Sequence, residues 1–318
     1  MWLALALVAA VVFGLRGILY HWSALQPIDR NLVLLGTFAT GSLICLSLGF
    51  ILDQNWSDGS LLGLLMGLFT FGANLSVYKG FAAGKSSLPA LFTSMSPVPV
   101  LLFSFLLWGE TVNARQLAAF VIIVSGVVLI RYAGRQSLQR LQGMRWGLLA
   151  LFFFALGDLS NKQASLAGGD PFPTLAYMCS VAAALFGSWW WIGRRRERRR
   201  RSLENQEEVG ARDRPVRMWS DGKTFLWGSV IGLVNITGMV LLFLAFSMGV
   251  TGLVTAVVSL HVILILLYAR FIVREPFRRT EMGALRWPWA AWRCCICSDE
   301  GVVRGLPTAA RKEDGKCQ

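Results

Sequence analysis

The chain has 318 residues, of which 55% are hydrophobic and only 15% are charged, and its formal net charge is +13 at pH 7. So few charged residues cannot cover the surface of a soluble domain of this length, which excludes an ordinary soluble protein. The apolar segments are continuous and do not alternate with polar residues, which excludes a transmembrane β-barrel.

Nine segments are long and apolar enough to cross a hydrocarbon core of about 30 Å as helices, which takes roughly 20 residues each. The first has no basic region before it and no small-residue cleavage site after it, so we expect an uncleaved helix and not a signal peptide. The sequence therefore predicts an all-α polytopic membrane protein. Its predicted spans are 2–22, 31–52, 60–82, 86–108, 113–131, 144–166, 171–193, 224–248 and 252–273.

Basic residues gather in two predicted loops, 131–145 and 194–223, and the second begins with the run Arg194–Arg201. Such runs also occur in nucleic-acid-binding proteins, but between two membrane spans they mark cytoplasmic loops. We therefore expect both loops to be cytoplasmic and to contact anionic lipid head groups, with no nucleic-acid partner. The loops after even-numbered spans are nearly free of Lys and Arg, which places the N-terminus outside.

Polar side chains within the predicted spans are candidates for a substrate cavity, because such groups are costly in hydrocarbon unless they are paired or wetted. Arg16 lies deep enough to require a partner, and anion recognition is one role for it. Asn235 fits cavity lining or a hydrogen bond to a neighbouring helix, and His261 fits a proton relay or a hydrogen bond to a neighbour. The full set is Arg16, Asn74, Tyr78, Ser94, Ser96, Asp158, Asn161, Lys162, Asn235 and His261.

The sixth span carries three of these candidates on one helix face, because Asp158, Asn161 and Lys162 are spaced at i, i+3 and i+4. One interpretation is a polar cavity wall in which Asp158 titrates with protons. The other is an intrahelical Asp158–Lys162 ion pair that neutralises both charges. The two interpretations are compatible.

Two further features interrupt or end predicted spans. Pro97 and Pro99 each remove a backbone donor, so we expect a kink that suits a gating helix or a static bend. Glu110 and Glu275 each end a span, and we expect a structural role for them, such as a cap or a salt bridge.

An internal repeat appears when the chain is shifted by 165 residues, because 63–110 then falls on 228–275 without a gap. The shift superimposes Gly63 on Gly228, Gly67 on Gly232 and Glu110 on Glu275. A repeat of five spans is odd in number, so the second copy must enter the membrane the other way up. Inverted repeats of this kind are typical of secondary transporters.

The segment 81–130, "FAAGKSSLPALFTSMSPVPVLLFSFLLWGETVNARQLAAFVIIVSGVVLI", resembles the EamA branch of the drug/metabolite transporter superfamily. The second copy keeps "FSMGVTGLVTAVVSLH" and "REPFRRTEMGA". The resemblance implies ten helices in two inverted repeats of five, with both termini cytoplasmic, which disagrees with the charge distribution. It divides the chain into a first repeat, 1–131, a connecting loop, 132–143, and a second repeat, 144–285.

The repeat register ends at Leu285, because Arg286 and Pro288 stand where the first copy continues as an apolar helix. We therefore expect that residues 286–318 are a non-homologous tail, frame-shifted or disordered, and that the tenth helix is missing. A genuine nine-helix protein with a cytoplasmic tail is the alternative. The tail cysteines lack the spacing of a metal site, and we expect no metal and no other cofactor.

These observations predict a secondary transporter that moves small organic solutes or metabolites by alternating access. The alternative is an inactive or scaffold relative that has lost its tenth helix. No nucleotide-binding motif is present, and one membrane aspartate with one membrane histidine gives no basis for an intramembrane enzyme. We expect a multi-pass protein of the bacterial inner membrane with an unidentified small-molecule substrate. A homodimer is a possible assembly.

Overall fold

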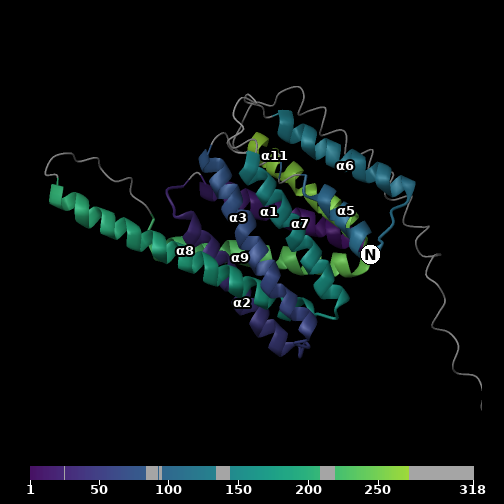
Figure 1. Cartoon of the computed structure of the whole chain (residues 1–318), viewed down its shortest axis with the longest axis horizontal. Helices are drawn as coiled ribbons and strands as arrows, with labels where there is room; N and C mark the ends of the chain where they lie inside the picture. Colours follow the sequence, from purple (N-terminus) through teal and green to yellow (C-terminus); the bar gives the residue numbers. More distant parts are fainter. Residues whose placement is uncertain (25, 84–91, 93–94, 134–143, 208–218, 272–318) are drawn as a thin grey trace, which may run out of the picture.

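A computed structural model describes all residues except 25, 84–91, 93–94, 134–143, 208–218 and 272–318 (Figure 1). Within that part of the chain the secondary structure is helical and contains no strand. The helices are α1 (Trp2–Ala24), α2 (Arg30–Ile51), a 3₁₀ turn η1 (Asp58–Leu61), α3 (Leu62–Ala83), α5 (Pro97–Trp108), α6 (Ala114–Ala133), α7 (Met144–Leu166), α8 (Pro171–Glu207), α9 (Asp221–Met248), α10 (Thr251–Ser259) and α11 (His261–Phe271).

Five helical segments in the described residues are long and apolar enough to cross a membrane, namely α1, α2, η1 with most of α3, α8 and α9. Their outer faces carry large apolar side chains that are more than half exposed, such as Val11, Leu43, Phe50 and Leu226. Helices satisfy their own backbone hydrogen bonds, so they can present such a surface to lipid but not to water. The fold is therefore that of an all-α, multi-pass membrane protein.

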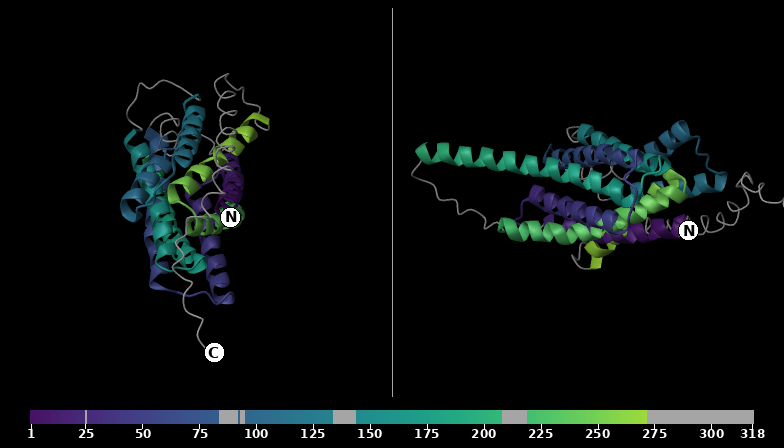
Figure 2. Two further views of the ribbon diagram at one scale, coloured as in Figure 1. Left: turned by 90° about the vertical axis from the view of Figure 1, so that its right-hand side faces the viewer. Right: turned by 90° about the horizontal axis from the view of Figure 1, so that it is seen from below.

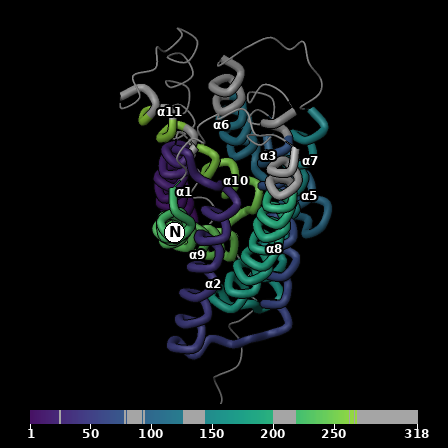
Figure 3. The backbone as a smooth tube through the Cα atoms, turned by 90° about the vertical axis from the view of Figure 1, so that its left-hand side faces the viewer, coloured from purple at the N-terminus to yellow at the C-terminus, as the bar shows by residue number. Residues whose placement is uncertain are grey.

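The helices of the two halves pack mainly against each other and not within one half (Figure 3). Helix α2 contacts α8 and α9, α3 contacts α7 and α8, and α1 contacts α9. Both kinds of contact occur twice between the halves: the repeat relates the α3–α8 contact to the α9–α2 contact, and the α3–α7 contact to the α9–α1 contact. This exchange is what an inverted pair of repeats requires, and it interlocks the two halves.

Glycines of the repeat allow this close packing. A Cβ added to Gly67 of α3 would lie 2.7 Å from the carbonyl oxygen of Met178, and one added to Gly232 of α9 would lie 2.6 Å from that of Thr37. One turn earlier in each helix pair, a Cβ at Gly63 or Gly228 would lie still closer to the carbonyl oxygen of Thr174 in α8 or of Val33 in α2. The coincidence of glycines in the two copies therefore has one cause, since the same two backbone crossings occur twice.

The two ends of the bundle are tied by different loops. At one end, Asn55 N donates to Asp170 Oδ2 at 2.8 Å, so the turn after α2 lies beside the turn after α7. At the other end, Trp219 N donates to Pro27 O at 3.1 Å, so the segment after α1 lies beside the start of α9. Loops after alternate spans therefore share an end, as in a chain that repeatedly crosses a membrane.

The prediction of a loop over 194–223 is wrong in its first half, because α8 continues as a helix to Glu207. Arg, Glu and Leu are good helix formers, so a basic composition outside the membrane does not end a helix. At its 37 residues, α8 is about 55 Å long by the usual rise per residue, well beyond the thickness of a bilayer core. It projects beyond the other helices in both Figure 1 and the right-hand view of Figure 2.

The last predicted span, 252–273, is broken into α10 and α11 at Leu260. Three side chains near the break lie against backbone carbonyls of α10. Thr255 Oγ1 donates to Gly252 O at 2.9 Å, Ser259 Oγ donates to Ala256 O at 2.6 Å, and His261 Nδ1 lies 2.8 Å from Val258 O. Such local bonds compete with the helical ladder and bend helices, which explains why an apolar segment does not run straight.

The glycine contacts predict opposite effects for one substitution at different sites. Gly67→Ala and Gly232→Ala place a methyl group against a backbone carbonyl, so each should cost roughly 1–3 kcal/mol of stability. Gly193→Ala in α8 meets no atom within 4 Å, and there alanine should stabilise the helix by up to about 1 kcal/mol. Thermal unfolding of the purified protein in detergent measures all three. Equal stability of Gly67→Ala and Gly193→Ala would contradict the packing argument.

Candidate functional site

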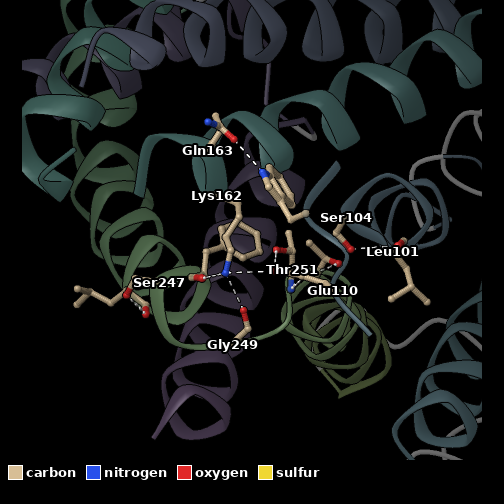
Figure 4. A network of polar contacts seen from close by, with 12 residues as sticks. Leu101, Ser104, Glu110, Lys162, Gln163, Ser247, Gly249 and Thr251 are labelled. Atoms are coloured by element: carbon tan, nitrogen blue, oxygen red, sulfur yellow. Dashed lines mark hydrogen bonds and ion pairs between the residues drawn. The ribbon is translucent and has the colours of Figure 1, made fainter. Parts of the chain in front are cut away.

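A buried ionic network joins the two repeats at the end of the bundle where α7 and α9 finish (Figure 4). Lys162 Nζ lies 3.2 Å from Glu110 Oε1, and the two side chains are only 8% and 14% exposed. The ammonium group also donates to the carbonyl oxygens of Phe246 at 2.7 Å and Gly249 at 3.1 Å. The Glu110 carboxylate accepts from Thr251 N at 2.8 Å and from Thr251 Oγ1 at 3.1 Å.

Local backbone structure places each group of this network. Gly109 has φ 63° and ends α5 in the left-handed conformation, so the chain turns and Glu110 follows directly after the turn. Helix α10 begins after Val250, whose side chain offers no cap, and Glu110 supplies the missing acceptor at its N-terminus. Lys162 meets the last carbonyls of α9, so each charge lies at the helix end whose dipole it complements.

Lys162 is therefore paired with Glu110 and not with Asp158, and the predicted intrahelical ion pair is not formed. The three acceptors around the ammonium group all belong to the protein, so the contacts of Lys162 in this conformation are structural. Glu110 provides both a salt bridge and a helix cap. The residues that sequence reasoning missed are Thr251 and the carbonyls at the end of α9. Their only signal in the sequence was the helix-ending glutamate that both copies of the repeat share, Glu110 and Glu275.

Asp158 and Asn161 lie on the same helix as Lys162 but are not part of this network. Asp158 is half-buried, about 5 Å from the middle of α7, and has neither an ion pair nor a hydrogen bond among the described residues. Asn161 is 2% exposed, and its Oδ1 has no partner within the same residues. This part of α7 therefore holds one carboxylate and one buried amide oxygen without a hydrogen-bond partner among the described residues.

A second polar pair lies between α1 and α9. Arg16 Nη1 donates to Asn235 Oδ1 at 2.7 Å, which brings together two of the predicted cavity residues from opposite repeats. Asn235 is 1% exposed and lies at the midpoint of α9, and Arg16 lies about 5 Å from the midpoint of α1. The guanidinium carbon is 4.5 Å from the centroid of the Phe13 ring, a cation–π contact.

The candidates on α3 do not join either pair among the described contacts. Asn74 Nδ2 donates to Thr70 O at 2.8 Å, a bond within its own helix. Tyr78 belongs to α3, but its side chain lies outside the described residues. Lys79 places its ammonium group 4.7 Å from the centroid of the Trp146 ring on α7, which fixes it against a neighbouring helix.

The remaining candidates lie around the broken helices. Ser96 precedes α5 without capping it through its side chain, and Pro97 and Pro99 occupy the first turn of α5, where no helical N–H is required. These prolines begin a helix in the described residues. His261 begins α11, as already noted. Ser94, Glu275 and the tail 286–318 lie outside the described residues, so the predicted loss of the tenth helix stays a prediction.

No cluster of three or more His, Cys, Asp or Glu side chains in the described part of the chain could hold a metal ion. Cys45 and Cys179 are buried and form no disulfide. The expectation of no cofactor therefore stays a prediction.

Comparison with known proteins identifies one family. Residues 1–132 and 141–285 match the profile of EamA, the EamA-like transporter family. No curated protein matches the chain. A solved crystal structure of another protein superposes with a TM-score of 0.68 over 95% of this chain and 98% of that chain, at 14% identity. At this identity the likeness shows a shared fold and nothing about activity.

The Glu110–Lys162 pair predicts strong coupling between the two residues. Lys162→Met or Glu110→Ala alone should cost roughly 3–5 kcal/mol, because each leaves one buried charge without its partner. The double variant should lose much less than the sum of the two, as measured by thermal unfolding in detergent. Asp221→Asn is the matched control, since its exposed pair with Arg194 should contribute only about 0–1 kcal/mol. Simple additivity of the two single changes would contradict the coupling.

Proposed function

Because the chain belongs to the EamA-like transporter family, we propose that it is a secondary transporter of small organic solutes or metabolites. The observation that carries the proposal is the placement of polar groups between the inverted repeats. Arg16 and Asn235 meet near the middle of α1 and α9, and Asp158 lies at a similar depth on α7. Substrate sites of inverted-repeat transporters lie near the midplane, where such groups are otherwise costly.

The packing supports a particular division between rigid and moving parts. Helices α2, α3, α8 and α9 cross through backbone contacts at glycine, and separating them would forfeit close packing across both repeats. The short helices α5, α10 and α11 begin or end inside spans and make fewer such crossings. We propose that access alternates through these broken helices, with the α2–α3–α8–α9 crossings as the fixed frame.

The Lys162–Glu110 network then acts as a latch at one end of the bundle. It joins the end of α5 and the turn between α9 and α10 to α7, so that end stays closed while the network is intact. Opening this end requires the Lys162–Glu110 ion pair either to move away as one unit or to break with both charges becoming hydrated. Since both charges become wet in an open conformation, the cost of separation falls as the end opens.

Asp158 is the candidate coupling group, because it is the acid inside the described spans whose carboxylate has no protein partner there. A half-buried carboxylate that carries a proton in one conformation and loses it in another links transport to the proton gradient. We propose no enzymatic activity for the chain. The alternative of an inactive or scaffold relative rests on residues 286–318, which lie outside the described residues.

The arginine-rich end of α8 supports the proposed orientation and lipid contacts. Arg194 and Arg195 lie over the rings of Trp190 and Trp191 at 5.3 and 3.5 Å, an arrangement that suits a membrane interface. We propose that this end is cytoplasmic, that it contacts anionic lipid head groups, and that the membrane is the bacterial inner membrane. A homodimer is compatible with the lipid-facing surface, and nucleic acid is not a proposed partner.

Transport in proteoliposomes tests this function. Vesicles with and without the full chain are offered a mixture of small metabolites, and mass spectrometry identifies any solute that the chain accumulates. For that solute, Asp158→Asn should remove the pH dependence of the rate, because the amide cannot titrate. Asp53→Asn, in an exposed loop, is the matched control and should keep the wild-type pH profile. An Asp158→Asn profile equal to that of the wild type would remove Asp158 as the coupling group.

A further inference from the structure

Building on the proposed transport function, we infer that Arg16 and Asn235 form the binding site for the carboxylate group of a small organic monoanion. The site lies between α1 and α9, at the contact between the two repeats. It assigns a substrate class to a transporter whose family membership does not specify one.

Two hydrogen-bond donors at this site have no partner among the described residues. Arg16 Nε and Asn235 Nδ2 are both buried and unsatisfied, and they belong to the two groups joined by the 2.7 Å hydrogen bond. The identity of the Asn235 atoms is fixed, because a guanidinium group has only donors and must face the amide oxygen. The atom left over is therefore an amide N–H. Both unused atoms are donors, so whatever satisfies each of them must be an acceptor, and the Nε atom on the charged group is the one that an anion would meet.

The charge of the site indicates that this acceptor is an anion. Arg16 keeps its positive charge at all accessible pH values, and no carboxylate of the described residues forms an ion pair with it. Lys162 is also a buried cation within a span, but it already has its counter-ion in Glu110. The Arg16 site therefore carries one uncompensated positive charge, and a ligand with one negative charge would neutralise it.

The geometry favours a carboxylate among small anions. Asn235 uses Nη1, which leaves the guanidinium edge formed by Nε and Nη2, and this edge binds the two oxygens of a carboxylate side by side. Asn235, bonded to Nη1 on the opposite side of the group, holds the guanidinium in place with this edge turned away from the amide. An ordered water would leave the charge uncompensated, and a chloride ion offers one acceptor atom where a carboxylate offers two oxygens that match two parallel N–H bonds.

The neighbours indicate that the rest of the ligand is apolar or small. The Phe13 ring covers the guanidinium group at 4.5 Å, and Gly14 and Gly17, on either side of Arg16 in α1, are approached by Leu264 and Ile265 of α11. Helix α11 is one of the broken helices that we propose to move, and it packs on the same turn of α1 that carries Arg16. Binding at this site therefore offers a direct way to favour one conformation over the other.

The test is thermal stabilisation of the full-length protein in detergent by defined probes at equal concentration. Sodium acetate and sodium benzoate should raise the unfolding midpoint, whereas benzyl alcohol and sodium chloride should not. Arg16→Gln should weaken carboxylate binding about 10- to 100-fold, as expected for loss of a buried charged hydrogen bond. Arg16→Lys keeps the charge but lacks the planar edge, so it should bind with intermediate affinity.

Asn235→Asp is the most informative variant, because it places a carboxylate of the protein beside Arg16. The internal ion pair should protect the fold and still abolish stabilisation by added carboxylates, which a purely structural Asn235 would not do. Arg145→Gln removes an exposed positive charge at the start of α7 and serves as the matched control with unchanged binding.

A chloride shift equal to that of the carboxylates, or a carboxylate shift that survives Asn235→Asp, would overturn the assignment. The site and the transport function can fail separately. Carboxylate binding without uptake of any solute in proteoliposomes would keep the site and remove the function. Uptake of a neutral solute with no response to any carboxylate would keep the function and remove the site.

Discussion

The absence of water from the bilayer core is the constraint on which the rest of this structure depends. A charged or hydrogen-bonding group in hydrocarbon must find its partner in the protein, in a cavity or in a ligand. Lys162 shows the first solution, since Glu110 and two carbonyls at the end of α9 surround its ammonium group. Because Lys162 on α7 finds these partners at the ends of two other helices, α5 and α9, one buried cation joins three helices and both repeats at one end of the bundle.

The same constraint explains why glycine recurs where the repeats cross. Between helices in lipid, the hydrophobic effect supplies little association energy, and stability comes from close packing and interhelical hydrogen bonds. Gly63 and Gly67 bring α3 against α8, and Gly228 and Gly232 bring α9 against α2. Thr37 adds a hydrogen bond across one of these crossings, from its hydroxyl to Gly228 O at 3.1 Å. The crossings thus form a closely packed frame, whereas α5, α10 and α11 make fewer such contacts, in keeping with the motion that we propose for them.

Much of the fold could be predicted from the sequence, because membrane spans are set by length and apolar composition. The predicted span 144–166 coincides with α7, and 2–22 differs from α1 only at its end. The course of the chain outside the membrane could not be predicted in this way. The arginine run after 193 was assigned to a loop on charge alone, although the same residues favour a helix and α8 continues through them.

The polar residues of the site could be selected from the sequence, but their partners could not. Helical spacing placed Asp158 beside Lys162, because residues four apart in a helix are always neighbours on its surface. The lysine instead reaches the ends of two other helices, where a dipole and a carboxylate act together. Likewise, the sequence identified Arg16 and Asn235 separately, and only the packing of α1 on α9 shows that they meet. Partner choice depends on which helix ends and faces come together, and that information is distributed over the whole chain.

The two buried cations differ in a way that separates structure from function. The Lys162 ammonium group has three donors that can rotate, and the protein surrounds it with acceptors that include the Glu110 carboxylate. Its charge is therefore neutralised without a ligand. Arg16 has a fixed planar fork, and the protein supplies one acceptor and an aromatic face. A fold that neutralises one cation so thoroughly has the means to neutralise the other. Arg16 Nε, by contrast, has no partner among the described residues, which is costly for a buried donor, and this difference is why we assign a ligand to Arg16 and not to Lys162.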